Sequence, residues 1–213
     1  TNMNAMFQQC YAFDQNLNLW DTHNVSNMGA MFSSAVAFNG DITTWNTSAV
    51  TNMGGMFQGA NVFNQDISGW DVSNVTNFQG TFIAAAFDQP IGSWNVSAAT
   101  NMQAMFQQAY AFNQPLNSWS TTNVTNMAGM FVNANAFNQP LNDWDVQNAT
   151  SMQSMFQGAS AFNQNLNSWN VGKVTNMSYM FYAASSFNGD IGAWNVGAVT
   201  TMIGMFVAAY NFN

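Results

Sequence analysis

The sequence predicts an α/β solenoid in which each 25-residue repeat supplies one short strand and one short helix, with the strands stacked into a parallel sheet. The first observation is the repeat itself, because tryptophans recur every 25 residues, with one step of 24. These are Trp20, Trp45, Trp70, Trp94, Trp119, Trp144, Trp169 and Trp194. The second observation is that the 16 Met and nearly all of the 19 Phe also occupy fixed positions in the repeat. Side chains that recur once per coil stack on themselves and form the core of a repeat protein.

The helix is expected at the start of each repeat. Met3, Met6, Phe7 and Cys10 are spaced i, i+3, i+4 and i+7, which is the apolar stripe of a short helix. A Thr or Ser precedes the stripe in every repeat and is a candidate N-cap. Cys10 occupies a position that is otherwise alanine, so we expect it to be a small buried residue.

The strand is expected around the tryptophan, for example in residues 67–72. Trp70 and Val72 lie two residues apart and would share one face of a strand. An Asn or Asp always follows the second Phe of the repeat, as Asn113 follows Phe112. A ladder of such side chains satisfies backbone groups that a tight bend would otherwise leave unpaired.

The whole chain, residues 1–213, is expected to be one solenoid domain of about 8.5 tandem repeats. One repeat has lost a residue between Ala85 and Phe87. The chain begins and ends inside a repeat, and neither end carries a polar capping unit, so we expect an excerpt of a longer array. Uncapped ends also indicate a capacity for end-to-end self-association.

Charge and hydropathy exclude two classes of partner. One Lys and no Arg stand against nine Asp, which gives a net charge of −8. A single cation cannot neutralise a row of phosphates, so nucleic acid is excluded. The longest strictly apolar run, residues 82–87, is far shorter than the roughly 20 residues that span a bilayer, so no membrane insertion is predicted.

No enzymatic activity and no cofactor are predicted. The chain has one His, His23, and one Cys, Cys10, which cannot supply the three or four ligands of a zinc site. His23 lies among residues that vary freely between repeats, so a solvated loop position is favoured over a catalytic base. Asp143 and Asp145 flank Trp144, but a linear stack brings no second carboxylate beside them for glycosidase chemistry.

Asp41 and Asp66 are the candidate calcium ligands. They occupy equivalent positions in neighbouring repeats, where stacked carboxylates repel unless they are solvated or bridged by a cation. The same position holds Pro90 and Asn165 in other repeats. Because a dedicated calcium site would not alternate with proline, we favour solvated loop side chains and predict no metal site.

The string W-D-V-S-N-V-T-N-M-x-x-M-F-x-x-A-x-x-F-N-Q-D-I-S resembles the repeat of BspA-like leucine-rich-repeat surface proteins, in the branch of Mycoplasma-type surface lipoprotein repeats. The resemblance covers the whole chain. It implies a right-handed coil of leucine-rich-repeat type on an extracellular or cell-surface protein with a role in adhesion. It implies no catalytic residues.

The tyrosines are the candidate partner-binding residues. Tyr11 and Tyr110 share one position in the repeat, while Tyr179 and Tyr182 lie three residues apart and close in sequence to Lys173. Exposed tyrosines are common anchors at interfaces. A second candidate face is the row of small polar residues that directly follow each Trp.

These observations favour a non-enzymatic binding module, an adhesin segment that recognises a protein or glycan on another cell or on the matrix. An ice- or crystal-surface binder is one alternative, because the chain has few charges and regularly spaced polar rows. A purely structural rigid stalk is the other.

Overall fold

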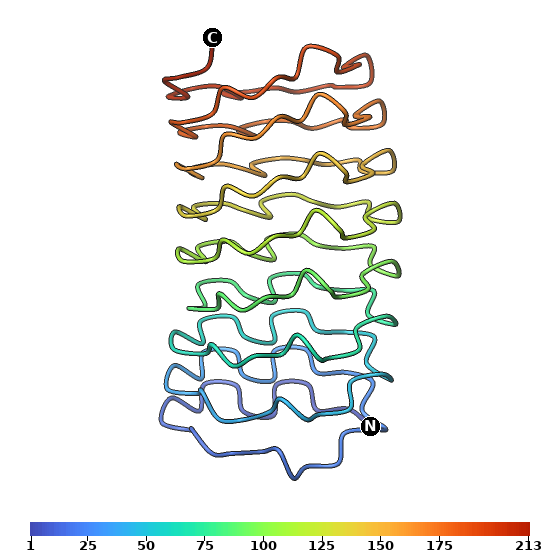
Figure 1. Ribbon diagram of the computed structural model, residues 1–213, viewed down its shortest axis with the longest axis vertical. Helices are drawn as coiled ribbons and strands as arrows, with labels where there is room; N and C mark the ends of the chain where they lie inside the picture. Colours follow the sequence, from blue (N-terminus) through green and yellow to red (C-terminus); the bar gives the residue numbers. More distant parts are fainter.

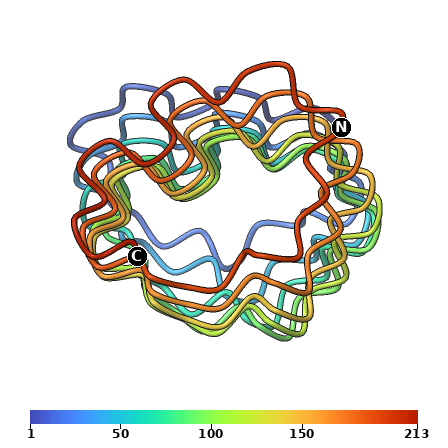
Figure 2. The ribbon, with the colours of Figure 1, turned by 90° about the horizontal axis from the view of Figure 1, so that it is seen from above.

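The computed structural model describes residues 1–213 as a single stack of coils, with about one coil for each repeat (Figure 1). The two termini lie at opposite ends of the stack (Figure 1). Figure 2 looks along the stack and shows each coil as a flattened ring that is indented on one long side. The first half of each repeat, from Thr-Asn-Met to the alanine, forms this indented side, and the half that carries the tryptophan forms the opposite side.

The prediction of one helix and one strand per repeat is wrong. No residue belongs to a helix, and no sheet is present. The only strand-like pairs are eight isolated parallel bridges, which join the second residue of one repeat to its equivalent in the next, as in Asn101 to Asn126. The fold is therefore a stack of linked turns and not an α/β solenoid of leucine-rich-repeat type.

Hydrogen bonds between coils replace the expected helix. In the first half of the repeat, alternate N–H groups donate to the next coil, as Ala104 does to Ala128 O (2.9 Å) and Phe106 to Met130 O (2.9 Å). The N–H groups between them donate three residues back, as Met105 does to Met102 O (3.2 Å). An α-helix requires each of these groups to bond four residues back within the coil, so the two patterns exclude each other.

Two residues of each coil also adopt a left-handed backbone, which a helix does not tolerate. In the fifth coil these are Ala104 (φ 55°) and Gln108 (φ 58°). The twelve non-glycine and six glycine residues with positive φ all fall in these same two positions of the repeat. The glycines at these positions are the sequence signal for this backbone.

Turns also replace the expected strand. The Trp70 N–H donates to Ile67 O (3.1 Å) and closes a turn just before the indole. On either side, the Ser68 N–H donates to Asp66 Oδ1 and the Ser73 N–H to Asp71 Oδ1, both at 3.0 Å. These side-chain turns bend the backbone that a strand would have kept extended.

The repeated apolar positions form the core, as the sequence predicts. A cluster of 59 buried residues runs through the stack. Rings stack from coil to coil, with centroids 5.7 Å apart for Phe57 and Phe82 and 6.3 Å apart for Trp119 and Trp144. Each inner indole N–H is satisfied by the coil below, as Trp119 Nε1 donates to Ile91 O (3.0 Å). No buried side-chain nitrogen or oxygen lacks a partner.

The predicted ladder of Asn and Asp side chains is confirmed. The Asn138 N–H donates to Asn113 Oδ1 (2.9 Å), and the Asn113 N–H donates to Asp88 Oδ1 (2.9 Å). The same bond occurs at every step from Asp14 to Asn213. It also crosses the shortened repeat, where the Asp88 N–H donates to Asn64 Oδ1 (2.9 Å). The ladder therefore keeps the coils in register despite the missing residue.

Candidate functional site

The first half of the repeat carries open hollows over the inner coils of the stack. Two of its hollows have volumes of about 300 and 340 Å³. Asn and Gln amides line the first hollow and Gln amides alone line the second, and small residues at the first left-handed position, such as Gly80 and Gly129, lie between them. The left-handed backbone favours glycine or another small residue there, and these small residues leave the hollows open.

The second hollow continues into a pair of tyrosines. Gln157 lines it and also lines an adjoining hollow of about 310 Å³, whose other lining residues are Tyr179 and Tyr182. We call this continuous surface the glutamine-tyrosine groove, and its residues are Gln103, Gln107, Gln153, Gln157, Tyr179 and Tyr182. They come from the repeats that begin at Thr100, Thr150 and Thr175, so the groove crosses four successive coils.

The glutamines of the groove retain free hydrogen-bonding capacity. Gln103 Oε1 accepts from Asn126 Nδ2 and Gln153 Oε1 accepts from Asn176 Nδ2, both at 3.1 Å, while their own NH₂ groups donate to no protein atom. The side-chain amides of Gln107 and Gln157 make no hydrogen bond within the protein. Because an amide offers two donors and one acceptor oxygen, the groove presents both functions to a ligand.

Tyr179 occupies a strained position at the end of the groove. Its φ is 58°, at the repeat position where the other coils have Ala, Gly or Ser. A bulky residue in the left-handed region is uncommon and marks a site worth testing for function. Gly204 makes room for the ring, since a Cβ there would lie 2.8 Å from ring atoms of Tyr179.

Tyr179 and Tyr182 form one aromatic unit. Their ring centroids lie 5.9 Å apart with an angle of 77° between the planes, which is an edge-to-face arrangement. The two residues are 38% and 37% exposed. A ligand in the groove therefore meets an open aromatic corner beside Gln157.

The other predicted partner-binding residues lie elsewhere. Lys173 Nζ donates to Asn148 Oδ1 (2.6 Å) on the coil below, and no hydrogen bond joins it to either tyrosine. Tyr110 borders a separate, mainly apolar hollow at the shortened repeat, together with residues 84–86. Tyr11 lies in the first coil and is 59% exposed. The structure thus brings together Tyr179 and Tyr182 but not Tyr11, Tyr110 or Lys173.

Sequence reasoning missed the glutamines. Gln103 and Gln107 flank the Met-Phe pair of one repeat, and Gln153 and Gln157 flank the same pair two repeats later. This matched spacing was the available signal. It was hidden because the expected helix would have made these residues ordinary exposed positions.

The row of polar residues after each Trp has a structural role. Asn46 Oδ1 accepts from both the N–H (3.1 Å) and the hydroxyl (2.7 Å) of Ser48, and equivalent turns occur at Asp71 and Asn95. These side chains are engaged with their own backbone, so they offer a partner less than the groove amides do.

Asp41 and Asp66 also cap turns of their own repeats. Asp41 Oδ1 accepts from the Thr43 N–H (3.0 Å) and hydroxyl (2.8 Å), and Asn18 Nδ2 donates to the other carboxylate oxygen. Hydrogen bonding from the side chain and then the backbone of Ser68 lowers the pKa of Asp66 below its usual value. No three His, Cys, Asp or Glu side chains gather as a metal-binding group.

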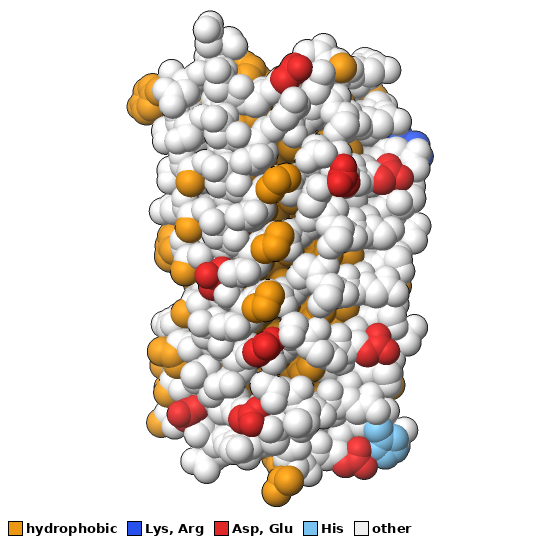
Figure 3. Space-filling model, in the orientation of Figure 1, with side chains coloured by type: hydrophobic (Ala, Val, Ile, Leu, Met, Phe, Trp, Pro, Cys, Tyr) orange, Lys and Arg blue, Asp and Glu red, His pale blue; other side chains and the backbone are white.

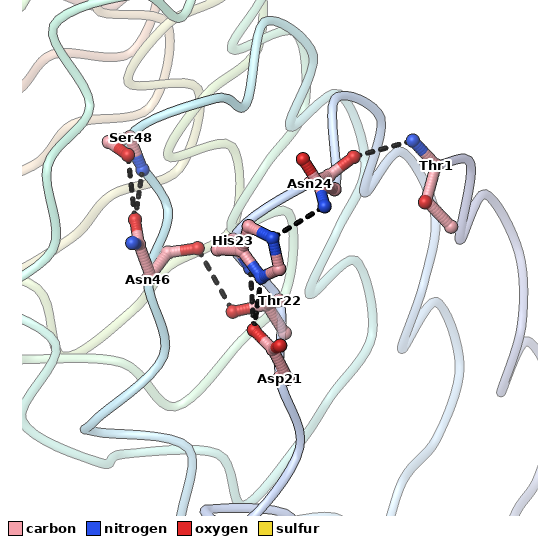
Figure 4. Close-up of polar contacts among 7 residues, drawn as sticks. All are labelled: Thr1, Asp21, Thr22, His23, Asn24, Asn46 and Ser48. Atoms are coloured by element: carbon pink, nitrogen blue, oxygen red, sulfur yellow. Dashed lines mark hydrogen bonds and ion pairs between the residues drawn. The ribbon is translucent and has the colours of Figure 1, made fainter.

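His23 belongs to the same kind of turn as Ser48 (Figure 4). Its Nδ1 lies 2.6 Å from Asp21 Oδ1 and its Nε2 lies 2.5 Å from Asn24 Nδ2. The side-chain hydrogen bond from His23 is the main cause that lowers the pKa of Asp21. The neighbouring Thr22 hydroxyl donates to Asn46 O (2.9 Å) and not to the imidazole.

The prediction that Cys10 is buried is wrong. It is exposed, whereas its equivalents in the inner coils, such as Ala35 and Ala60, are fully buried. The difference arises because Cys10 belongs to the first coil, which is covered on one side only.

Charge is confined to the other half of the repeat. All nine Asp lie between the second Phe and the turn after the Trp, so none lies in the half that forms the groove. Figure 3 shows one broad face of the stack, on which acidic side chains lie singly among uncharged ones.

The comparisons with known proteins identify the family of the chain but do not indicate an activity. No segment of the structure forms a helix that could cross a membrane. No curated protein sequence matches the chain. The family model described as "Mycoplasma protein of unknown function, DUF285" matches residues 1–86, 70–165 and 139–213, which together cover the whole chain. The chain therefore belongs to this family of Mycoplasma-type repeat proteins.

Proposed function

We propose that the chain is a non-enzymatic binding module, an adhesin segment of an extracellular or cell-surface protein, and that it recognises its partner through the glutamine-tyrosine groove. The observation that carries this proposal is the free amide of Gln157 beside the exposed rings of Tyr179 and Tyr182. Aromatic anchors supply contact area at binding sites, and a few placed polar groups fix the orientation of the ligand.

The proposed location rests on the resemblance of the repeat to BspA-like leucine-rich-repeat surface proteins, which implies a surface protein with a role in adhesion. A net charge of −8 with a single Lys is in keeping with a protein or glycan partner. The partner would lie on another cell or on the matrix.

A binding array of glycans and extracellular proteins tests the proposal, run with calcium and again with a chelator. We expect saturable binding that is lost in Gln157→Ala. It should be retained in Gln89→Ala, which removes an amide from the half of the repeat that carries the tryptophan. Both variants should keep the circular dichroism spectrum of the wild type.

Three outcomes would contradict the proposal. If the folded protein binds nothing on the array, this would favour a rigid stalk that acts only as a spacer. Ice-shaping activity without any saturable ligand would favour the crystal-surface binder. Binding that disappears in chelator but survives Gln157→Ala would move the site to Asp41 and Asp66.

A further inference from the structure

We infer that the ligand of the glutamine-tyrosine groove is a linear, uncharged glycan chain that lies along the axis of the stack. This inference rests on the proposed function and assigns a ligand class to the same groove. Four features carry it: the direction of the groove, the chemistry of its amides, its aromatic end and its lack of charge.

The direction of the groove calls for an elongated ligand. Hydrogen bonds such as Ala104 N to Ala128 O and Gly129 N to Gln153 O (2.8 Å) join the coils below the groove. Coils joined in this way rise by about 4.8 Å each, so the groove from Gln103 to Tyr179 is on the order of 15 Å long. A chain of repeating units laid along the axis meets equivalent amides, first Gln103 and Gln107 and then Gln153 and Gln157.

The amides suit hydroxyl groups. A hydroxyl both donates and accepts, and the unbonded amides of Gln107 and Gln157 offer both functions to it. Gln103 and Gln153 differ, because Asn126 and Asn176 donate to their oxygens and leave their NH₂ groups free to donate to a ligand. A sugar chain presents hydroxyl and ring oxygens that match this mixture of donors and acceptors.

The tyrosines suit the apolar face of a sugar ring. A pyranose carries C–H groups on its faces and hydroxyls around its rim, so it can pack on an aromatic ring while its rim reaches polar groups. Tyr179 and Tyr182 meet edge to face at 77° and form a corner open to solvent. Gln157 lines the same hollow and can reach the rim of a ring seated there.

The absence of charge favours a neutral glycan over an acidic one. No Asp or Lys lines the groove. The net charge of −8 repels anionic polymers at long range, and Lys173, the one Lys, is bonded to Asn148 outside the groove.

A peptide fits the groove less well than a glycan. Peptide grooves use apolar pockets for alternate side chains or the free edge of a sheet. The apolar residues of the second hollow are only Ala104, Ala128 and Val132. The structure has no sheet that could present an edge.

Calorimetric titration of the intact chain tests the inference. The probes are neutral oligosaccharides of increasing length, built from glucose, mannose, galactose or N-acetylglucosamine, with sialylated and sulfated oligosaccharides as acidic counterparts. We expect at least one neutral series to bind, with affinity that rises with chain length and then levels off as the groove fills. Gln157→Ala and Tyr182→Ala should each weaken binding about ten-fold or more, because each removes a direct contact.

The matched controls are Gln89→Ala and Tyr210→Ala, which remove an amide and a tyrosine outside the groove and should bind as the wild type does. Should Tyr182→Ala fail to fold, as judged by circular dichroism, the comparison of Gln157→Ala with Gln89→Ala decides alone.

The contrary outcomes are distinguishable. Neutral glycans that bind Gln157→Ala and Tyr182→Ala as tightly as the wild type would overturn the groove as their site. Acidic oligosaccharides that bind equally well would overturn the requirement for an uncharged ligand. A protein partner that is lost in these variants while no glycan binds would overturn the glycan inference and leave the proposed function standing. If no partner of any class binds, the proposed function and the glycan inference are both wrong.

Discussion

At the scale of the residue, Trp119 shows why the same side chain recurs in every coil. Its indole ring stacks on Trp144, and its N–H donates to the buried carbonyl of Ile91. Trp119→Phe removes the indole donor and leaves a gap in the core, while the Ile91 carbonyl keeps only its bond from the Trp94 N–H (3.1 Å), so we expect a loss of about 1 to 3 kcal/mol in the free energy of unfolding. Urea unfolding measures this loss.

Trp20→Phe is the matched control. Trp20 is only partly buried, and its indole nitrogen has no acceptor in the first coil, so its loss should be clearly smaller. Equal losses at the two positions would show that the hydrogen bond and the inner packing contribute little.

The turn-capping aspartates predict how stability depends on pH. Hydrogen bonds from Ser68 and Ser73, side chain first and backbone second, lower the pKa of Asp66 and Asp71 below the usual 3.8. A carboxyl with a lowered pKa in the folded state stabilises it above the unfolded pKa, and this contribution is lost as the pH falls through the folded pKa. Stability should therefore decrease below about pH 4.

The double variant Asp66→Asn with Asp71→Asn isolates this effect. An amide oxygen still caps the turn but does not titrate over this range. Urea unfolding at pH 7 and near pH 3 should show a smaller acid-induced loss in the double variant than in the wild type. An identical loss would assign the acid sensitivity to other groups.

At the scale of the element, the sequence predicts what lies inside each coil better than the backbone that places it there. The spacing of Met102, Met105 and Phe106 is common to an amphipathic helix and to a chain of turns closed three residues back. Both arrangements place these side chains in the core, so the core and the Asx ladder were predictable. Periodicity alone could not distinguish the two backbones.

The candidate site was predictable only in part. Tyr179 and Tyr182 stood out because they interrupt the repeat, and the structure places them together. The glutamines could be assigned to the same surface only from the structure, where left-handed residues such as Gly129 lie beside them in the second hollow. The only indication in the sequence that Tyr179 adopts a left-handed backbone was that Gly and Ala occupy the same position in other repeats.

The Asx ladder gives a prediction at this scale. Asn113→Leu leaves the Asn138 N–H without its acceptor and should lower the free energy of unfolding by about 1 to 3 kcal/mol. Asn113→Asp keeps the acceptor, as Asp14 and Asp88 do at the same position, and should cost much less. Chemical denaturation of both variants makes the comparison, and similar losses would show that the ladder bond is not what the position selects.

At the scale of the whole molecule, each coil is bonded only to the coils next to it, which predicts graded stability along the stack. Phe131 and Phe7 both donate to the following coil, to Met155 O and Met31 O at 2.8 Å. Phe131 is fully buried in an inner coil, whereas Phe7 lies in the first. The amide of Phe131 should therefore exchange with deuterium far more slowly in native-state hydrogen exchange. Equal protection would indicate a single cooperative unit.

The most direct test of the proposed binding role combines stability and affinity in one variant, Tyr179→Gly. Glycine adopts the left-handed backbone without strain, which offsets the lost contact with Tyr182, so the free energy of unfolding should stay within about 1 kcal/mol of the wild type. Affinity for the ligand found in the binding array should fall about ten-fold or more. A folded variant with unchanged affinity would show that Tyr179 does not serve binding. A loss of several kcal/mol in the free energy of unfolding would show that Tyr179 serves the fold.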